Sequence, residues 1–166
     1  MGMLRRRTTP DAVKAVALDR GERRVAWALT TGGAAVVATD RGLRLPDGTV
    51  LAWDRIERAS FSRPVLTVLE LAEVEGAGES HQVALDLDGE LTDLPETVRT
   101  RVASSVAWSS HTKLQPAGGV RIVGRRRPGL EVLDWQLVFD RDTDPRDPGV
   151  RAQAEEYLAA ARRTIG

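Results

Sequence analysis

Residues 43–56, LRLPDGTVLAWDRI, contain the clearest hairpin pattern of the chain. Apolar and polar residues alternate in both halves, which predicts two half-buried β-strands. The halves are separated by Pro-Asp-Gly at 46–48, where Pro presets φ, Asp caps the turn and Gly takes a left-handed conformation. We therefore expect a hairpin in which Leu43 faces Leu51. Its second strand leads directly into Trp53, so the geometry of the hairpin fixes the position of the indole.

The same pattern continues on both sides of the hairpin. Short apolar and β-branched segments alternate with turn residues, which predicts an antiparallel meander. The predicted strands cover residues 24–31, 34–40, 42–45, 49–53, 56–61, 65–71 and 81–87. A helix over 94–105 follows, with Asp93 as its expected N-cap and Glu96 reaching back to it. Every fourth residue from Leu94 is apolar, so one face of this helix should cover the sheet.

The C-terminal part, residues 106–166, predicts a βββα extension packed on residues 1–105. Its strands are expected near 106–113, 119–127 and 131–140, and its helix over 148–164 with Asp147 as the cap. A Pro-Gly centre predicts a type II turn at 127–130, which would pair Ile122 with Trp135. The predicted fold class is mainly β (α+β), in two parts.

Composition excludes several classes of function. The 24 basic and 24 acidic residues cancel, so no overall field attracts nucleic acid or an anionic membrane. There is no cysteine, and therefore no disulfide, thiol nucleophile or Cys-ligated zinc. The N-terminal segment lacks the features of a signal peptide and no stretch is apolar enough for a transmembrane segment. We expect a cytoplasmic protein without a cofactor.

Three short motifs carry a resemblance. They are Leu-x-x-Gly-Glu at 18–22, Thr-Asp-Arg at 39–41 and Trp-Asp-Arg-Ile at 53–56. In composition and order they resemble the motifs of small bacterial PH-like (GRAM-like) domains, and the 106–166 extension resembles that of uncharacterised proteins from high-GC bacteria. The resemblance implies a seven-strand, partly open barrel capped by a helix over residues 1–105.

Three apolar residues are expected to have structural roles. In a partly open barrel an indole at the corner fills the gap between the two sheets, which is the place we expect for Trp53. Ile56 would be the next core residue, and Trp135 lies on the buried side of its strand. A ligand-stacking role for Trp53 is the alternative.

One concentrated charge feature stands out, at Arg121, Arg125 and Arg127. Strand alternation places these three side chains on one face, where they would form an exposed basic ridge. A ridge of this kind attracts phosphate or an acidic partner. The alternative is a solvated strand face without a binding role.

Catalytic and metal motifs are weak. His81 and His111 are the only histidines, and neither lies in a nucleophile-elbow sequence. The acidic stretch 140–144 resembles a calcium loop but has Pro145 where the turn glycine is needed. Asp86 and Asp88 resemble a phosphatase nucleophile loop, but the predicted meander is the wrong architecture for it. We expect no metal site.

The function expected from the sequence is a non-enzymatic intracellular interaction module with a protein partner. Lipid is disfavoured, because phosphoinositide-binding PH-like domains use basic residues near the first two strands and residues 25–40 contain none. An anion or nucleic-acid binder that uses the basic ridge is the second hypothesis, and a hydrolase is the third.

Overall fold

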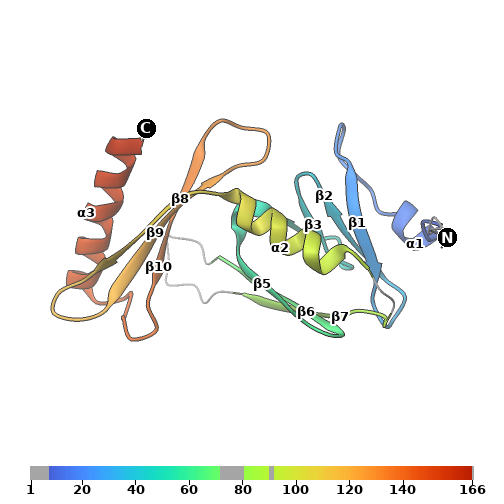
Figure 1. Cartoon of the computed structure of the whole chain (residues 1–166), viewed down its shortest axis with the longest axis horizontal. Coiled ribbons are helices and arrows are strands. Elements are labelled where there is room, and N and C mark those ends of the chain that lie inside the picture. Colours follow the sequence, from blue (N-terminus) through green and yellow to red (C-terminus); the bar gives the residue numbers. More distant parts are fainter. Residues whose placement is uncertain (1–7, 72–80, 90–91, 166) are drawn as a thin grey trace, which may run out of the picture.

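The structure is a computed structural model that describes residues 8–71, 81–89 and 92–165. It contains three antiparallel sheets and is mainly β (Figure 1). The elements in chain order are α1 Asp11–Lys14, β1 Arg24–Leu29, β2 Ala35–Thr39, β3 Gly42–Arg44, β4 Val50–Ala52, the 3₁₀ turn η1 Trp53–Arg55, β5 Ile56–Ser62, β6 Val65–Glu70, β7 Gln82–Asp86, α2 Leu94–Ser105, β8 Val106–Lys113, β9 Gly119–Arg126, β10 Leu133–Phe139 and α3 Pro148–Ile165.

The hairpin predicted for residues 43–56 forms, with β3 and β4 as its strands. Leu43 pairs with Leu51 across β3 and β4. The turn has Gly48 at φ 88°, a conformation that glycine adopts without the penalty of a Cβ. The Asp47 carboxylate accepts a hydrogen bond from the Thr49 N–H at 2.9 Å. The sheet it belongs to has the order β1-β2-β3-β4.

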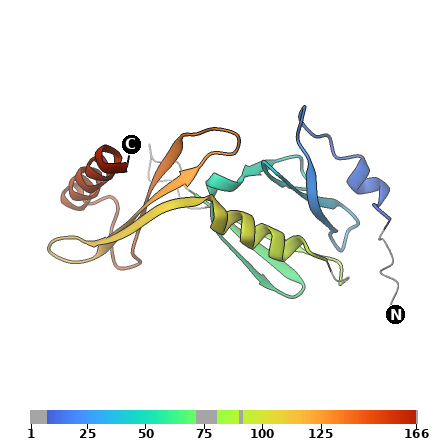
Figure 2. The ribbon, with the colours of Figure 1, turned by 45° about the horizontal axis from the view of Figure 1, so that its top comes forward.

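The second sheet has the order β5-β6-β7 and lies beside the first. The two are joined at one corner, where Thr30 bridges to Leu87 and the Thr31 N–H donates to the Asp86 carbonyl at 3.0 Å. The described strands form no closed barrel. Figure 2 shows α2 running along the open side, where its apolar face packs on both sheets.

Trp53 lies at the corner between the sheets, in η1, and is 3% exposed. Its indole N–H donates to the Thr39 carbonyl at 3.0 Å, which satisfies the one polar atom of the ring inside the core. Ile56 follows at the start of β5 and is fully buried. Both side chains belong to the main core, whose buried members are Ala26, Ala28, Val36, Ala38, Leu43, Leu45, Leu51, Trp53, Ile56, Leu66, Val68, Leu85, Leu87, Leu94, Val98 and Val102.

Two local features differ from the sequence prediction. The outer face of β2 is covered by α1, whose Val13 packs on Ala35 and Val37, so all five residues of β2 are buried. The cap of α2 comes from Thr92 instead of Asp93. Its hydroxyl oxygen accepts from the Leu94 N–H at 3.2 Å, while Asp93 makes no side-chain cap.

The C-terminal extension, β8 to α3, follows α2 without a linker. Its sheet has the order β10-β9-β8, and α3 covers one face with the side chains Val150, Ala154, Leu158 and Ala161. Asp147 caps α3 as predicted, accepting from the N–H groups of Gly149 and Val150. Among the described helices none is long and apolar enough to cross a membrane.

The register of β9 and β10 is a correction. The predicted turn is present, with Gly129 at φ 78°, but residues 131 and 132 extend the loop. Ile122 therefore pairs with Leu137, two residues beyond Trp135. Because a shift of two keeps every side chain on its face, Trp135 still lies on the α3 side. There its ring meets Trp108 edge to face, with centroids 5.7 Å apart.

Candidate binding groove between β5 and α2

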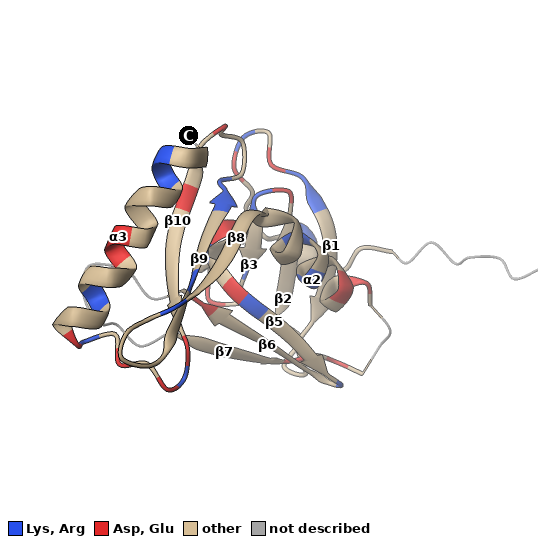
Figure 3. Cartoon of the chain, turned by 60° about the vertical axis from the view of Figure 1, so that its left-hand side comes forward, with Lys and Arg blue, Asp and Glu red and all other residues tan. Residues whose placement is uncertain are grey.

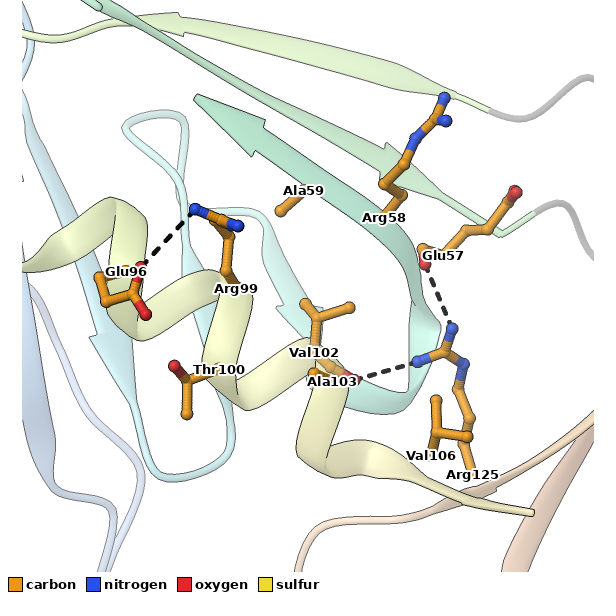
Figure 4. Close-up of a pocket in the computed structure, with 10 residues that line it drawn as sticks. All are labelled: Glu57, Arg58, Ala59, Glu96, Arg99, Thr100, Val102, Ala103, Val106 and Arg125. Carbon is orange, nitrogen blue, oxygen red and sulfur yellow. Dashed lines mark hydrogen bonds and ion pairs between the residues drawn. The ribbon is translucent and has the colours of Figure 1, made fainter. Parts of the chain in front are cut away.

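A groove of about 430 Å³ runs between β5 and α2 (Figure 4). Its residues come from β5, from the exposed side of α2, from the start of β8 and from β9. They are Glu57, Arg58, Ala59, Glu96, Arg99, Thr100, Val102, Ala103, Val106 and Arg125. Four of them are alanine or valine, so part of the lining is small and apolar, and charged side chains contribute the rest.

One wall of the groove is a strand edge. β5 is the end strand of its sheet and pairs with β6 only, among the described strands. Alternate residues of such a strand direct their backbone N–H and C=O groups away from the neighbouring strand. The Glu57 carbonyl lies outside the ladder because the pairing of β5 with β6 is irregular between Ile56 and Arg58, and it accepts a hydrogen bond from Arg125. An edge of this kind is a template for one more strand.

The charged residues of the groove belong to both signs. Arg99 and Glu96, one turn apart on α2, form an ion pair of 3.7 Å, and Arg58 is exposed on β5. Over the described residues basic and acidic positions are interspersed, as along α3 (Figure 3). Neither the groove nor the surface around it presents the single-sign field that phosphate-rich ligands need.

Arg125 closes one end of the groove. It reaches from β9 of the extension and is 4% exposed. Its Nη1 donates to the Ser105 hydroxyl at 2.8 Å and to the Val102 carbonyl at 3.2 Å, while Nη2 donates to the Glu57 carbonyl at 3.2 Å. Figure 4 shows the guanidinium between the last turn of α2 and the first residues of β5. Desolvation lowers its pKa.

This position corrects the predicted basic ridge. Arg121 and Arg125 do share a face of β9, but only Arg121 is exposed, where it donates to the Ser109 hydroxyl at 3.3 Å. The other part of the molecule covers the end of the sheet that carries Arg125. Arg127 lies beyond the strand and forms a bidentate ion pair with Asp134. The three arginines therefore do not form one exposed surface.

Arg125 belongs to a polar interface between the two parts of the molecule, which we call the seam: Asp54, Glu57 and Ser105 on one side, Arg125, Asp134 and Gln136 on the other. The Gln136 side chain links its members. Its amide oxygen accepts from Arg125 Nε at 3.0 Å, and its amide nitrogen donates to the Asp54 carbonyl at 2.7 Å.

The seam also contains a pair of carboxyl groups. Asp54 is 2% exposed, and its Oδ1 has no hydrogen-bond partner in the part of the chain that the structure describes. Burial raises the pKa of Asp54 to about 6, and the hydrogen bond to the neighbouring Asp134 adds to this. That hydrogen bond, together with Arg127, lowers the pKa of Asp134. Below about pH 6, Asp54 is thus the group of the pair that holds the proton.

The three motifs of the sequence analysis meet in a second buried polar group, the motif cluster: Glu22, Thr39, Arg44 and Trp53. The Glu22 carboxylate accepts from the Thr39 hydroxyl at 2.6 Å and from Arg44 through both of its oxygens. Burial opposes its ionisation, but these hydrogen bonds outweigh burial and lower the pKa of Glu22 to about 2. Thr39 also holds the Trp53 indole through its carbonyl.

The weak catalytic motifs remain apart. His111 pairs with Asp140 at 2.9 Å and His81 lies 3.8 Å from Glu70, and no described serine is hydrogen-bonded to either histidine. Asp140 is used in that pair, and the Asp144 carboxylate accepts from the Arg146 N–H. In the described residues no group of three or more His, Asp or Glu side chains could hold a metal ion.

Sequence reasoning identified the elements that form the groove but missed the groove itself. Alternation along β5 shows which side chains share a face, but it does not show that the strand is an edge. The sequence did contain a signal that Arg125 is buried, because the three residues before it, Ile122, Val123 and Gly124, have no polar side chain. The chain matches no protein-family model, no curated protein and no solved structure.

Proposed function

We propose that the protein is a non-enzymatic interaction module that binds an extended segment of a protein partner in the groove between β5 and α2. The observation that carries this proposal is the edge of β5, with which no described strand pairs, beside a groove of about 430 Å³. Backbone hydrogen bonds to an edge strand supply affinity for any extended chain, and the lining side chains select its sequence.

A PH-like arrangement of residues 24–105 is part of the proposal. It is supported by the order of four strands, three strands and a helix, and by the corner at which Thr30 bridges to Leu87. The contacts within the motif cluster support it as well, because they give all three motifs a common structural role. In this reading α2 both closes the core and forms the second wall of the groove.

A protein partner fits the groove better than the other ligands considered. The turn between β1 and β2, residues 30–34, contains no basic side chain that would hold a lipid headgroup. Arg125 and Arg127 are engaged within the molecule, which removes the basis for a nucleic-acid ridge. Small apolar groups and a strand edge are the features that an extended peptide uses.

The test is to fill the groove without disturbing the core. Ala103 is exposed on α2 and lines the groove, whereas Ser104 is exposed beside it and does not. Peptides selected from a random display library should slow backbone hydrogen exchange in β5. Ala103→Arg should weaken them at least tenfold, a loss of about 1.4 kcal/mol, and Ser104→Arg should leave them unchanged. Selected peptides that protect another surface, or equal effects of the two variants, would contradict the proposal.

A further inference from the structure

Among the described residues, no anion contacts the cation at the end of the groove, Arg125. Arg125 makes four hydrogen bonds, and every acceptor is neutral: a side-chain amide, a hydroxyl and two backbone carbonyls. No carboxylate of the described residues forms an ion pair with it. The Glu57 carboxylate belongs to the same strand as one of those carbonyls, but it points away from the guanidinium in Figure 4.

A buried charge without a counter-ion is unusual. Arginine stays protonated in proteins, so burial does not neutralise it, and buried charges are as a rule paired. Neutral acceptors satisfy its N–H groups but leave the positive charge in place. The nearby carboxylates of Glu57 and Asp54 stabilise the charged form of the guanidinium, although neither touches it. The groove therefore ends in a guanidinium whose N–H groups contact no anion among the described residues, and an anionic ligand group would supply that contact.

Arg125 also has a hydrogen-bond donor to spare. A guanidinium carries five N–H groups, and the four bonds use one on Nε, two on Nη1 and one on Nη2. The second N–H of Nη2 is left, on the nitrogen that bonds the edge of β5. A carboxylate placed there would accept a charge-assisted hydrogen bond, which is stronger than a neutral one.

The geometry selects one source for that carboxylate. Arg125 is bonded to α2 at the Val102 carbonyl and to β5 at the Glu57 carbonyl, so it spans the groove from wall to wall. A peptide bound along the groove must therefore end at Arg125 or turn out of the groove at that point. The Glu57 carbonyl, which would accept from a further residue of a bound strand, is already occupied. A chain terminus fits this end better than the side chain of an internal Asp or Glu.

We propose that the groove receives the C-terminal end of its protein partner, whose α-carboxylate binds Arg125. This inference rests on the proposed function. The partner strand then runs antiparallel to β5, with its last residue beside Glu57 and its earlier residues beside Ala59 and Phe61. Small side chains at Ala59 and Ala103 leave room for the last apolar residues of the partner.

The experiment displays one random peptide library in two ways. In the first display each peptide ends in a free carboxylate, and in the second its C-terminus is blocked by fusion to the carrier protein. Peptides from the first display are synthesised as the free acid and as the carboxamide, and both are titrated against the full chain. The free acid should bind at least about tenfold more tightly. The Nε–H resonance of Arg125 should shift with the acid and stay in place with the amide.

Variants locate the effect on the protein. Arg125→Lys keeps the charge but loses the bonds that position it, and should reduce the acid-to-amide preference to about twofold or less. Arg121→Lys, on the exposed part of the same strand, should leave the preference intact. If Arg125→Lys fails to fold, the acid-to-amide comparison and the Arg125 resonance in the unmodified chain still decide the question.

The outcomes separate the two proposals. Acid and amide that bind within about twofold of each other, while β5 is still protected from exchange, overturn the carboxylate site and leave the proposed function standing. A preference for the acid without a shift at Arg125 also overturns the site. If neither display yields a peptide that protects β5, both proposals fail.

Discussion

The motif cluster and the seam are two buried polar groups that begin at adjacent residues, Trp53 and Asp54, and they differ in how completely they are satisfied. In the motif cluster the Glu22 carboxylate has an arginine, a hydroxyl and a backbone N–H as donors. In the seam one oxygen of Asp54 has no described partner, and none of the described carboxylates contacts Arg125.

The difference shows in the ionisation of the two carboxyls. The pKa of Glu22 is lowered to about 2, whereas that of Asp54 is raised to about 6. Both are buried, so burial alone does not decide the direction; the neighbouring donors do. A satisfied cluster contributes mainly to stability. In the incompletely satisfied seam, the Arg125 guanidinium can still bind an anionic ligand and the Asp54 carboxyl can still gain or lose a proton as the pH changes.

The largest expected effect lies in the motif cluster and the core it borders. Trp53→Ala should lower the free energy of unfolding by about 3–5 kcal/mol, because it leaves a cavity between the sheets. Trp53→Phe keeps most of the volume but loses the bond to Thr39, and should cost about 1 kcal/mol beyond the change in volume. Denaturant unfolding measures both. An Ala variant as stable as the parent would show that the indole does not fill the corner.

The seam should respond less strongly to loss of its central side chain. Arg125→Met leaves four acceptors without their donor, and we expect a loss of about 2–3 kcal/mol. Glu57 and Asp134, at the rim of the seam, are only half-buried, so we expect water to solvate part of what the guanidinium leaves and the loss to stay below that of Trp53→Ala. Urea midpoints of the two variants give the comparison. A loss under about 0.5 kcal/mol would mean that Arg125 is free at the surface.

The place of Trp53 in the motif cluster could be anticipated from sequence, whereas the seam could not. Turn chemistry at 46–48 and alternation around it predicted the hairpin, and the expected barrel placed Trp53 at the corner between the sheets. The contacts of Glu22, which precedes β1, with Thr39 on β2 and Arg44 on β3 span 17 and 22 residues and were not predicted.

The seam depends on how two separately patterned parts dock. Alternation placed Arg125 and Arg121 on one face but could not show that residues 24–105 cover only one end of that face. The β9–β10 register was displaced by two residues for a related reason. A Pro-Gly centre identifies a turn, yet nothing local fixes how many residues follow before pairing resumes.

The pH dependence of stability should distinguish the two carboxyls. The folded pKa of Glu22 lies below its ordinary 4.5, so its contribution is present above that pH and is lost as pH falls toward about 2. The folded pKa of Asp54 lies above its ordinary 3.8. Its contribution is present below that pH and is lost as pH rises through about 6.

Amide substitutions test this directly. Asn at 54 imitates the protonated acid and still donates to Asp134, so Asp54→Asn should raise stability on the order of 1–2 kcal/mol at pH 8 and leave it nearly unchanged at pH 4. Glu22→Gln should lower stability on the order of 2 kcal/mol at pH 7, with the difference shrinking below pH 4.5. Thermal unfolding between pH 3 and pH 8 measures both. Parallel profiles for the two variants would show that their environments are equivalent.

The smallest effect is expected at Arg121, which is the matched control for Arg125. Arg121 and Arg125 lie four residues apart on the same strand and face, so they have the same intrinsic strand preference and the same charge. Arg121→Ala removes only one long hydrogen bond to Ser109 and should change the free energy of unfolding by no more than about 0.5 kcal/mol. Its urea midpoint should coincide with that of the parent, in contrast to the midpoint of Arg125→Met. If both arginine variants lost the same free energy of unfolding, that loss would come from their place on β9 and not from the contacts of the seam. Docking against residues 24–105 would then no longer explain why one arginine of the pair is buried.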